Sequence, residues 1–295
     1  MARTPEQNNA IITGNIPRQL LLFFFPIWLG TMFQQLYNTV DTLIVGNFVG
    51  TQALAAVGAT SSFVQLLVGL FVGLCSGAGV IIAQSFGAGD HDEVNRQVHT
   101  ALALAIAGGA ALTVIGLLIS RPVLRLMQTP DEIVGMASEY LQIYFLGMIP
   151  QMIYNMGTNI LRAVGDSKRP LYFLIVASIV NIVLDIVLVA VIPLGVAGAA
   201  IATVLSQAVG AAWIILFLTG KKTILRLRRD YLRPEKQIIL PVLALGISSF
   251  VMLSTESLLS ISFSSSLARY GGDVAVGAMT VITSASQLCT LPIQG

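Results

Sequence analysis

Two carboxylates interrupt apolar stretches of this sequence, and they are the residues best suited to carry chemistry. Asp41 lies near the end of an apolar run that begins around residue 20. Asp185 lies four residues after Asn181, and the three residues between them are apolar. A charged side chain at the centre of a bilayer costs at least about 2.5 kcal/mol. We therefore expect Asp41 to face a protein interior or a watery cavity, with the rest of the chain built around it.

Amide side chains accompany Asp41 at helical spacing. Gln34, Asn38 and Asp41 fall at i, i+4 and i+7, so they share one stripe of the expected helix. Pro26 lies well inside the same helix, where it removes a backbone hydrogen bond and permits a kink. The sequence thus predicts a polar face and a bending point on one helix.

A second set of oxygen-bearing side chains accompanies Asp185. Asn181 precedes it by one helical turn, and Thr203, on the next apolar run, can add a hydroxyl. Carboxylate, amide and hydroxyl oxygens suit hard cations, and a buried carboxylate can hold a proton instead. We expect Asp41, Asn181, Asp185 and Thr203 to form a cation or proton site. The alternative is that these groups only hydrogen-bond neighbouring helices.

A polar and aromatic stripe follows on the fourth apolar run. Its members are Tyr140, Tyr144, Gln151, Asn155 and Asn159, at steps of four, seven, four and four residues. Met148, Met152 and Met156 lie along it. Flexible methionines beside aromatic and amide groups suit a cavity for varied amphipathic ligands, and ordinary helix packing is the alternative.

Glu256 is a third acid in an apolar run. Small hydroxyl residues surround it from position 254 to 257 and could solvate its carboxylate. It could line the same cavity, or it could be a carboxylate that reaches up to the outer membrane surface.

Composition sets the class of protein. The chain has 295 residues, of which 55% are hydrophobic and 10% charged, and its mean hydropathy is +0.83. Soluble domains carry about 25% charged residues, so we predict an all-α polytopic membrane protein. Residues 1–15 lack the apolar region and cleavage site of a signal peptide, so the first helix should act as the insertion signal.

The sequence contains no motif that is typical of a soluble enzyme. His91 and His99 lack metal-ligand spacing, and no nucleotide-binding glycine loop occurs. Cys75 and Cys289 both lie in apolar runs, so neither a disulfide nor a metal site is expected. We predict no enzyme activity, no cofactor, no nucleic-acid partner and no metal other than Na⁺ at the cation site.

Apolar runs of about 20 residues predict eight spans. They cover residues 17–41, 53–84, 97–119, 134–159, 170–192, 195–218, 238–260 and 275–295, with turn residues between them. With the N-terminus inside, thirteen of the sixteen lysines and arginines fall on the inner side. The positive-inside rule therefore predicts a cytoplasmic N-terminus.

The spans divide into two lobes. Residues 1–220 form a six-helix N-terminal lobe, residues 221–236 a basic cytoplasmic linker, and residues 237–295 the first two helices of an incomplete second lobe. Pro241 and Glu256 repeat the 15-residue spacing of Pro26 and Asp41, which indicates parallel repeats.

With these features in hand, the chain resembles the multidrug and toxic compound extrusion family. The motifs that carry the resemblance are Val40-Asp41-Thr42, Gly87-Ala88-Gly89, Leu161-Arg162-Ala163-Val164-Gly165-Asp166-Ser167 before Arg169-Pro170, Asn181 with Asp185, and the run from Gly195 to Thr203. They extend over essentially the whole chain. The family continues for roughly four more helices beyond Gly295, which is a large departure.

The resemblance implies a secondary multidrug antiporter, or the N-terminal two-thirds of one, in a family with two six-helix lobes, a central cavity and exchange of organic cations for Na⁺ or H⁺. It implies a cation or proton site at Asp41, Asn181, Asp185 and Thr203, with Pro26 as the bending point. It also implies a multi-pass protein of the cell membrane, monomeric as a full-length chain.

Two other functions remain open. A flippase for lipid-linked oligosaccharides should line its cavity with arginine and lysine, yet no basic residue lies at the centre of a span. A non-transporting membrane scaffold gives no reason for carboxylates in apolar runs.

Overall fold

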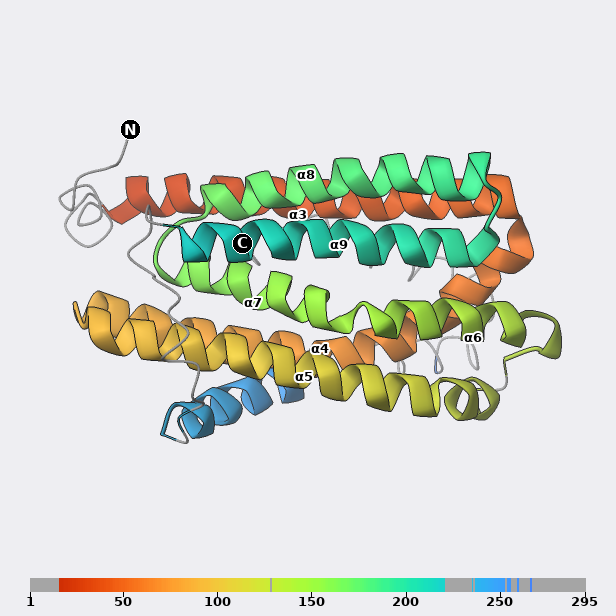
Figure 1. The fold of residues 1–295 in the computed structure, drawn as a ribbon. Helices are drawn as coiled ribbons and strands as arrows, with labels where there is room; N and C mark the ends of the chain where they lie inside the picture. Colours follow the sequence, from red (N-terminus) through yellow and green to blue (C-terminus); the bar gives the residue numbers. More distant parts are fainter. Residues whose placement is uncertain are drawn as a thin grey trace.

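The computed structural model describes residues 16–127, 129–220, 235 and 237–252, and the single positions 254, 255, 259 and 266. Every regular element in these residues is helical (Figure 1). The elements are α3 (Ile16–Ile44), η1 (Val45–Val49), α4 (Thr51–Gly87), α5 (His91–Leu126), α6 (Asp131–Leu146), α7 (Met148–Ala163), α8 (Lys168–Asp185), η2 (Ile186–Val191) and α9 (Gly195–Thr219). A further helix covers Gln237–Met252. The predicted all-α class is confirmed.

Five described segments are long and apolar enough to cross a membrane. They are Pro17–Val49, Leu67–Gly87, His91–Leu126, Lys168–Val191 and Gly195–Thr219. The fourth expected span is instead divided into α6 and α7 at Gly147. The third expected span, residues 97–119, is longer than predicted, because α5 begins at His91 and continues through Pro122 to Leu126.

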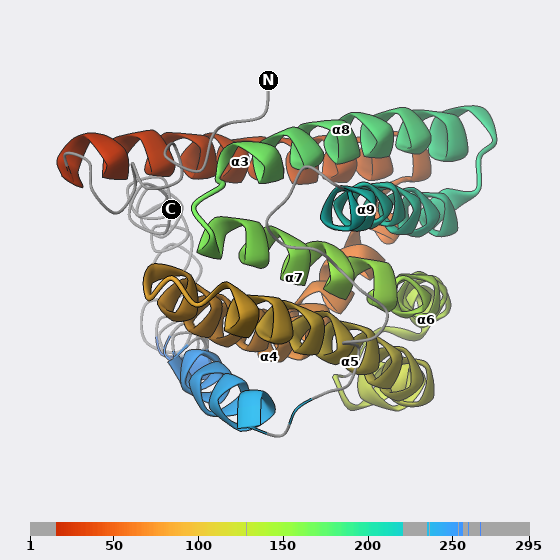
Figure 2. The same cartoon turned by 60° about the vertical axis from the view of Figure 1, so that its left-hand side comes forward.

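The helices run back and forth between two ends of a bundle (Figures 1 and 2). The start of α3, the α4–α5 turn and the α7–α8 turn lie together at the end drawn on the left, which we call the basic end. Arg18, Arg96, Arg162, Lys168 and Arg169 belong to these segments. The opposite end carries η1, the α5–α6 turn and the α8–α9 turn.

Local chemistry explains where the helices begin. The Asp90 side chain accepts a hydrogen bond from the Glu93 amide at 3.0 Å and so caps α5. Gly89 precedes it with φ of 78°, a conformation that costs glycine little. Asp166 accepts a bond from the Arg169 amide at 3.2 Å at the start of α8. These short, fixed turns set the order of the helices at the basic end.

The main core lies where α4, α5, α6, α7 and α9 meet. Phe145 of α6 is fully buried there, and it packs edge-on against Phe63 with ring centroids 5.8 Å apart. A Cβ at Gly116 of α5 would lie 2.2 Å from the Phe145 ring. The absence of a side chain at Gly116 thus lets the two helices approach closely. Cys75 is a free thiol in this core.

The helix Gln237–Met252, which is drawn in blue in Figure 2, packs on α4. A Cβ at Gly73 would lie 2.7 Å from the Gly246 carbonyl oxygen, and one at Gly77 would lie 2.7 Å from the Val242 carbonyl oxygen. Such contacts are possible only for glycine. Most of the expected linker, the eighth span, Cys289 and Glu256 fall outside the described residues.

An ion-pair cluster joins this helix to α5 at the basic end. Arg96 Nε donates to Glu235 Oε1 at 2.9 Å, its Nη2 bonds the other oxygen, and its Nη1 donates to Glu93 at 3.0 Å. The contact with Arg96 lowers the pKa of the Glu235 carboxyl. Because both side chains are partly exposed, we assign the pair an orienting role and little stability.

The glycine contact between α4 and Gln237–Met252 is testable with Gly77→Ala. The new Cβ would meet backbone atoms, which cannot move aside, so we expect the free energy of unfolding to fall by about 1–3 kcal/mol. Gly69→Ala is the matched control, because nothing lies within 4 Å of a Cβ there. Thermal unfolding of both variants in detergent checks this, and equal midpoints would contradict the contact.

Candidate functional site

Asp41 of α3 and Asp185 of α8 lie close enough to influence each other's charge where the two helices pack together. Asp185 is 0% exposed, and Asp41 is partly buried. Asp41 Oδ1 and both carboxyl oxygens of Asp185 find no hydrogen-bond donor among the described residues. Ionised carboxylates accept hydrogen bonds and cannot donate them, so this pair calls for a proton or a cation between its members.

Both acids precede a wide π-helical turn. α8 ends at Asp185 and continues as η2, while η1 begins four residues after Asp41. Such turns in otherwise α-helical segments are frequent at functional sites, because they disrupt the regular hydrogen-bond ladder. The two helices that carry the acids therefore change their winding on the same side of the pair.

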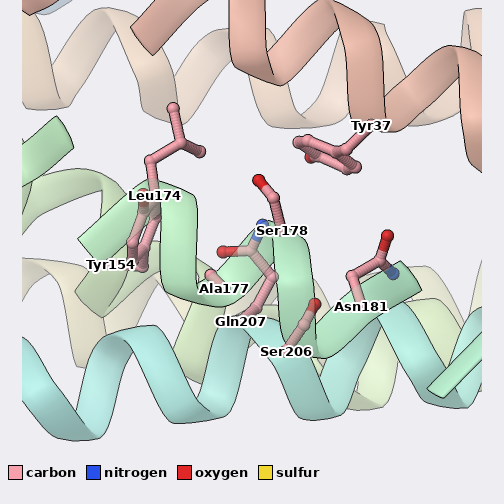
Figure 3. A pocket seen from close by; sticks show the side chains of 8 residues that line it. All are labelled: Tyr37, Tyr154, Leu174, Ala177, Ser178, Asn181, Ser206 and Gln207. Carbon is pink, nitrogen blue, oxygen red and sulfur yellow. The ribbon is translucent and has the colours of Figure 1, made fainter. Parts of the chain in front are cut away.

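A small cavity, drawn in Figure 3, is lined by Tyr37 and Asn181, which lie one helical turn before Asp41 and Asp185 respectively. Its lining comes from four helices and comprises Tyr37, Tyr154, Leu174, Ala177, Ser178, Asn181, Ser206 and Gln207. The cavity volume is about 10 Å³, which is roughly what one water molecule needs. The cavity can therefore hold a water or a dehydrated cation, and it is too small for a drug.

Several polar atoms around this cavity have no partner in the described part of the chain. They are Ser178 Oγ, both side-chain polar atoms of Asn181, and Gln207 Oε1. Buried polar atoms are normally hydrogen-bonded, so a group of orphans next to two carboxylates indicates a missing ligand or water. Among the described residues no cluster of three or more His, Cys, Asp or Glu could hold a transition metal.

Tyrosines form a second layer around the acids. Tyr140 is 8% exposed and interacts electrostatically with both Asp41 and Asp185. It stacks on Tyr144 with ring centroids 6.0 Å apart and planes 17° from parallel. The Tyr144 hydroxyl accepts a hydrogen bond from Gln151 Nε2 at 3.0 Å. This bond crosses the break between α6 and α7.

The break itself is fixed by packing. A Cβ at Gly147 would lie 2.4 Å from the Val204 side chain of α9, so only glycine fits. The Thr113 hydroxyl of α5 donates a hydrogen bond shared between two carbonyl oxygens, that of Gly109 at 3.0 Å and that of Phe145 at 2.8 Å. The Phe145 carbonyl is thereby satisfied next to the interrupted ladder.

The interruption changes part of the predicted stripe. Met148, Met152 and Met156 are at most 2% exposed and belong to the apolar core, which favours the alternative of ordinary helix packing over a place in a ligand cavity. Asn159 donates its side-chain amide to the Asn155 carbonyl oxygen at 2.9 Å, within α7. Tyr140, Tyr144 and Gln151 are the stripe residues that the structure brings together.

The remaining predicted residues are dispersed. Thr203 donates to the Ala199 carbonyl at 3.0 Å, within its own helix, and is partly buried. Gln34 and Asn38 are exposed on α3. Pro26 is buried inside α3, and Glu256 lies outside the described residues. The acids and Asn181 thus converge, whereas Gln34 and Asn38 lie on an open face.

Most residues that line this cavity were not singled out in the sequence analysis. Tyr37 lies one turn before Asp41, and Ser206 lies one turn after Thr203, so helical spacing could have indicated both. Tyr154 could not be found in this way. The break at Gly147 resets the helical phase between α6 and α7, which puts Tyr154 on the cavity side.

The comparison with known families is decisive. The family model MatE matches residues 26–187, which include both acids and more than half of the chain. The chain belongs to the MatE family. The homologues in this family are transporters and not enzymes, and the five long apolar segments of this chain are those of a multi-pass membrane protein. Asp41 and Asp185 both fall within the matched region.

Curated relatives of the MatE chain carry multidrug names. It is 31% identical over 282 residues to the probable multidrug resistance protein YoeA of Bacillus subtilis, covering 93% of this chain and 61% of that protein. It is 23% identical over 258 residues to the multidrug export protein MepA of Staphylococcus aureus, covering 86% and 56% respectively. The chain therefore spans about three fifths of the length of these relatives.

Solved structures are similar over nearly the whole chain. A MOP superfamily transporter from Pyrococcus furiosus matches with a TM-score of 0.91 at 27% identity, covering 99% of this chain and 65% of that one. A crystal structure of MATE in the bent conformation matches equally, with a TM-score of 0.91, 27% identity and coverage of 98% and 64%. The MatE fold of this chain is thus shown by independent comparisons.

The orphaned carboxylate predicts an unusual effect of Asp185→Asn. A buried carboxylate without donors destabilises the fold, so the neutral amide should keep or raise the free energy of unfolding in Na⁺-free buffer at pH 7. Asp166→Ala is the control, because Asp166 bonds both the amide and the guanidinium of Arg169. We expect that variant to lose about 1 kcal/mol. Thermal unfolding in detergent measures both, and a similar loss at Asp185 would contradict the orphaned state.

Proposed function

We propose that this MatE-family protein is a secondary transporter that exports amphipathic organic cations in exchange for Na⁺ or H⁺. The observation that carries the proposal is the contact between Asp41 and Asp185, next to unpartnered polar atoms in a cavity of ion size. The multidrug names of relatives support the substrate class. No cofactor is required, and the coupling ion is the only bound species that the mechanism needs.

An ion gradient supplies the energy in this mechanism. Each elementary charge that crosses 100 mV releases about 2.3 kcal/mol. Two adjacent carboxylates in a low-dielectric site disfavour double ionisation, so Asp41 and Asp185 alternate between an occupied state and an empty charged state. Asn181 supplies amide oxygen to the ion, and Thr203 supplies hydroxyl oxygen when its helix turns toward the pair.

Occupation of the pair acts on the first helix. A proton or Na⁺ changes the hydrogen bonds available to Asp41 and so shifts the equilibrium of α3 between straight and bent at Pro26. Solved MATE structures at 27% identity are described as being in bent and in straight conformations, which supports a two-state helix. Bending of α3 would change the space on its open face.

That open face is the proposed place for substrate. Gln34 and Asn38 lie exposed on α3 beside the acids, and Tyr140, Tyr144 and Gln151 form the polar layer behind them. Asn155 and Asn159 complete the proposed cavity, and the role of Glu256, which lies outside the described residues, stays a prediction from the sequence. In this arrangement the chain is a cell-membrane protein with a cytoplasmic N-terminus, surrounded by lipid and monomeric as a complete transporter.

The alternative of a lipid-linked oligosaccharide flippase is less well supported. A pyrophosphate carrier needs cations at the substrate cavity. The described arginines and lysines of α3 to α9 lie near the ends of the helices, whereas Asp41 and Asp185 lie inside the apolar segments Pro17–Val49 and Lys168–Val191. A non-transporting scaffold would not explain why two carboxylates lie in apolar segments.

The ion site can be tested by Asp41→Asn and Asp185→Asn. Each change should abolish uphill efflux of a fluorescent organic cation from cells or inverted vesicles, because the site can no longer alternate in charge. Asp92→Asn is the control, since Asp92 is exposed at the start of α5. Efflux is measured across a range of pH and Na⁺ concentration. If both acid variants match wild type with the same dependences, the coupling proposal is wrong.

The bending point can be tested by Pro26→Ala. Restoring the helix hydrogen bond favours the straight helix by up to about 3 kcal/mol, so the bent population and the efflux rate should fall by up to about a hundredfold. Pro122→Ala is the control, because Pro122 is an exposed proline inside α5. Binding of the organic cation, measured by fluorescence, should persist in both variants. Unchanged efflux in Pro26→Ala would exclude the hinge.

A further inference from the structure

A second cavity lies at the basic end of the bundle. It has a volume of about 230 Å³ and is bounded by Phe23 of α3, Phe86 and Gly87 at the end of α4, and Arg162 at the end of α7, with Gly165 in the following turn. It shares no lining residue with the cavity beside the acids. Its walls are aromatic or small, and Arg162 is the cation among them.

The charge of Arg162 is not neutralised by any described carboxylate. Its Nε is buried and has no hydrogen-bond partner, and no ion pair joins it to a described residue. Asp166, one turn further along the chain, is taken by Arg169, whose Nη1 donates to it at 2.7 Å. A half-buried guanidinium with free donors has a strong need for an anion.

The surroundings of the cavity indicate which anion it is. Leu20, Leu21, Leu22 and Phe25, next to Phe23 on α3, are 52% to 66% exposed, as expected for side chains that face lipid tails. The cavity lies where these lipid-facing residues meet the helix ends, which is the depth of phospholipid headgroups. Basic pockets between membrane helices bind anionic headgroups.

We propose that Arg162 and its cavity bind the phosphate of an anionic phospholipid from the leaflet at the basic end. The guanidinium donates to the phosphate oxygens in fork geometry, the small residues Gly87 and Gly165 leave room for the headgroup, and Phe23 and Phe86 contact the glycerol and upper acyl chain. This site is separate in space from the acid pair, because its cavity shares no lining residue with the cavity near Asp41 and Asp185.

Native mass spectrometry of the purified chain tests the proposal. Each protein is released from micelles that contain phosphatidylglycerol, and the fraction that retains the lipid gives its affinity. We expect the affinity of wild type to be about fivefold higher than that of Arg162→Gln, because one basic contact is lost. Arg18→Gln is the matched control, because Arg18 is an exposed cation at the same end that does not line the cavity and has no printed contact with Asp166. Equal retention by wild type and Arg162→Gln overturns the proposal, as does equal loss in both variants.

Chemical labelling of wild type provides a second test that needs no variant. Phenylglyoxal modifies free guanidinium groups, and peptide mass spectrometry locates the product. Phosphatidylglycerol should protect Arg162 and leave the exposed Arg18 reactive, whereas phosphatidylcholine should protect neither. Protection by inorganic phosphate alone would assign the site to a soluble anion and overturn the lipid source, and absence of protection by phosphatidylglycerol would overturn the site.

Discussion

The contact between Asp41 and Asp185 is the constraint on which the rest of this structure depends. Two carboxylates brought together inside an apolar bundle, without donors, cost free energy that the surrounding packing must offset. α3 and α8 pack closely to hold them, and a Cβ at Gly30 would already touch Leu171 and Leu174 at 3.6 and 3.5 Å. The fold keeps a locally unfavourable arrangement, as proteins do at sites that bind something.

Interrupted helices are the means by which this bundle places polar groups inside a membrane. η1 and η2 widen the helices beyond the acids, and the break at Gly147 separates α6 from α7. Each interruption frees backbone groups that need partners away from water. Thr113 satisfies one of them by bonding the Phe145 carbonyl from α5. Irregular backbone therefore occurs where neighbouring helices cover it.

Hydropathy predicted the helical class and most spans because long apolar runs have few other solutions in a bilayer. The cost of an intramembrane carboxylate similarly pointed to Asp41 and Asp185 before any contact was known. Sequence could not predict the break at Gly147, which depends on the approach of Val204 from a distant helix. For the same reason the sequence could not decide whether the methionines of α7 line a cavity or fill the core, and the structure places them in the core. Tertiary packing decided both points.

α3 forms one wall of both cavities. Tyr37 lines the cavity beside the acids, and Phe23 lines the cavity that holds Arg162. The two positions are 14 residues apart, or about 21 Å along a helix, and Pro26 lies between them. A bend at Pro26 would move Phe23 relative to Tyr37, so a headgroup on Arg162 and an ion on the acid pair would bias the same equilibrium. Linkage requires such coupling to be reciprocal: a lipid that favours one shape of α3 would alter the ion affinity, and the ion would alter the lipid affinity by the same factor.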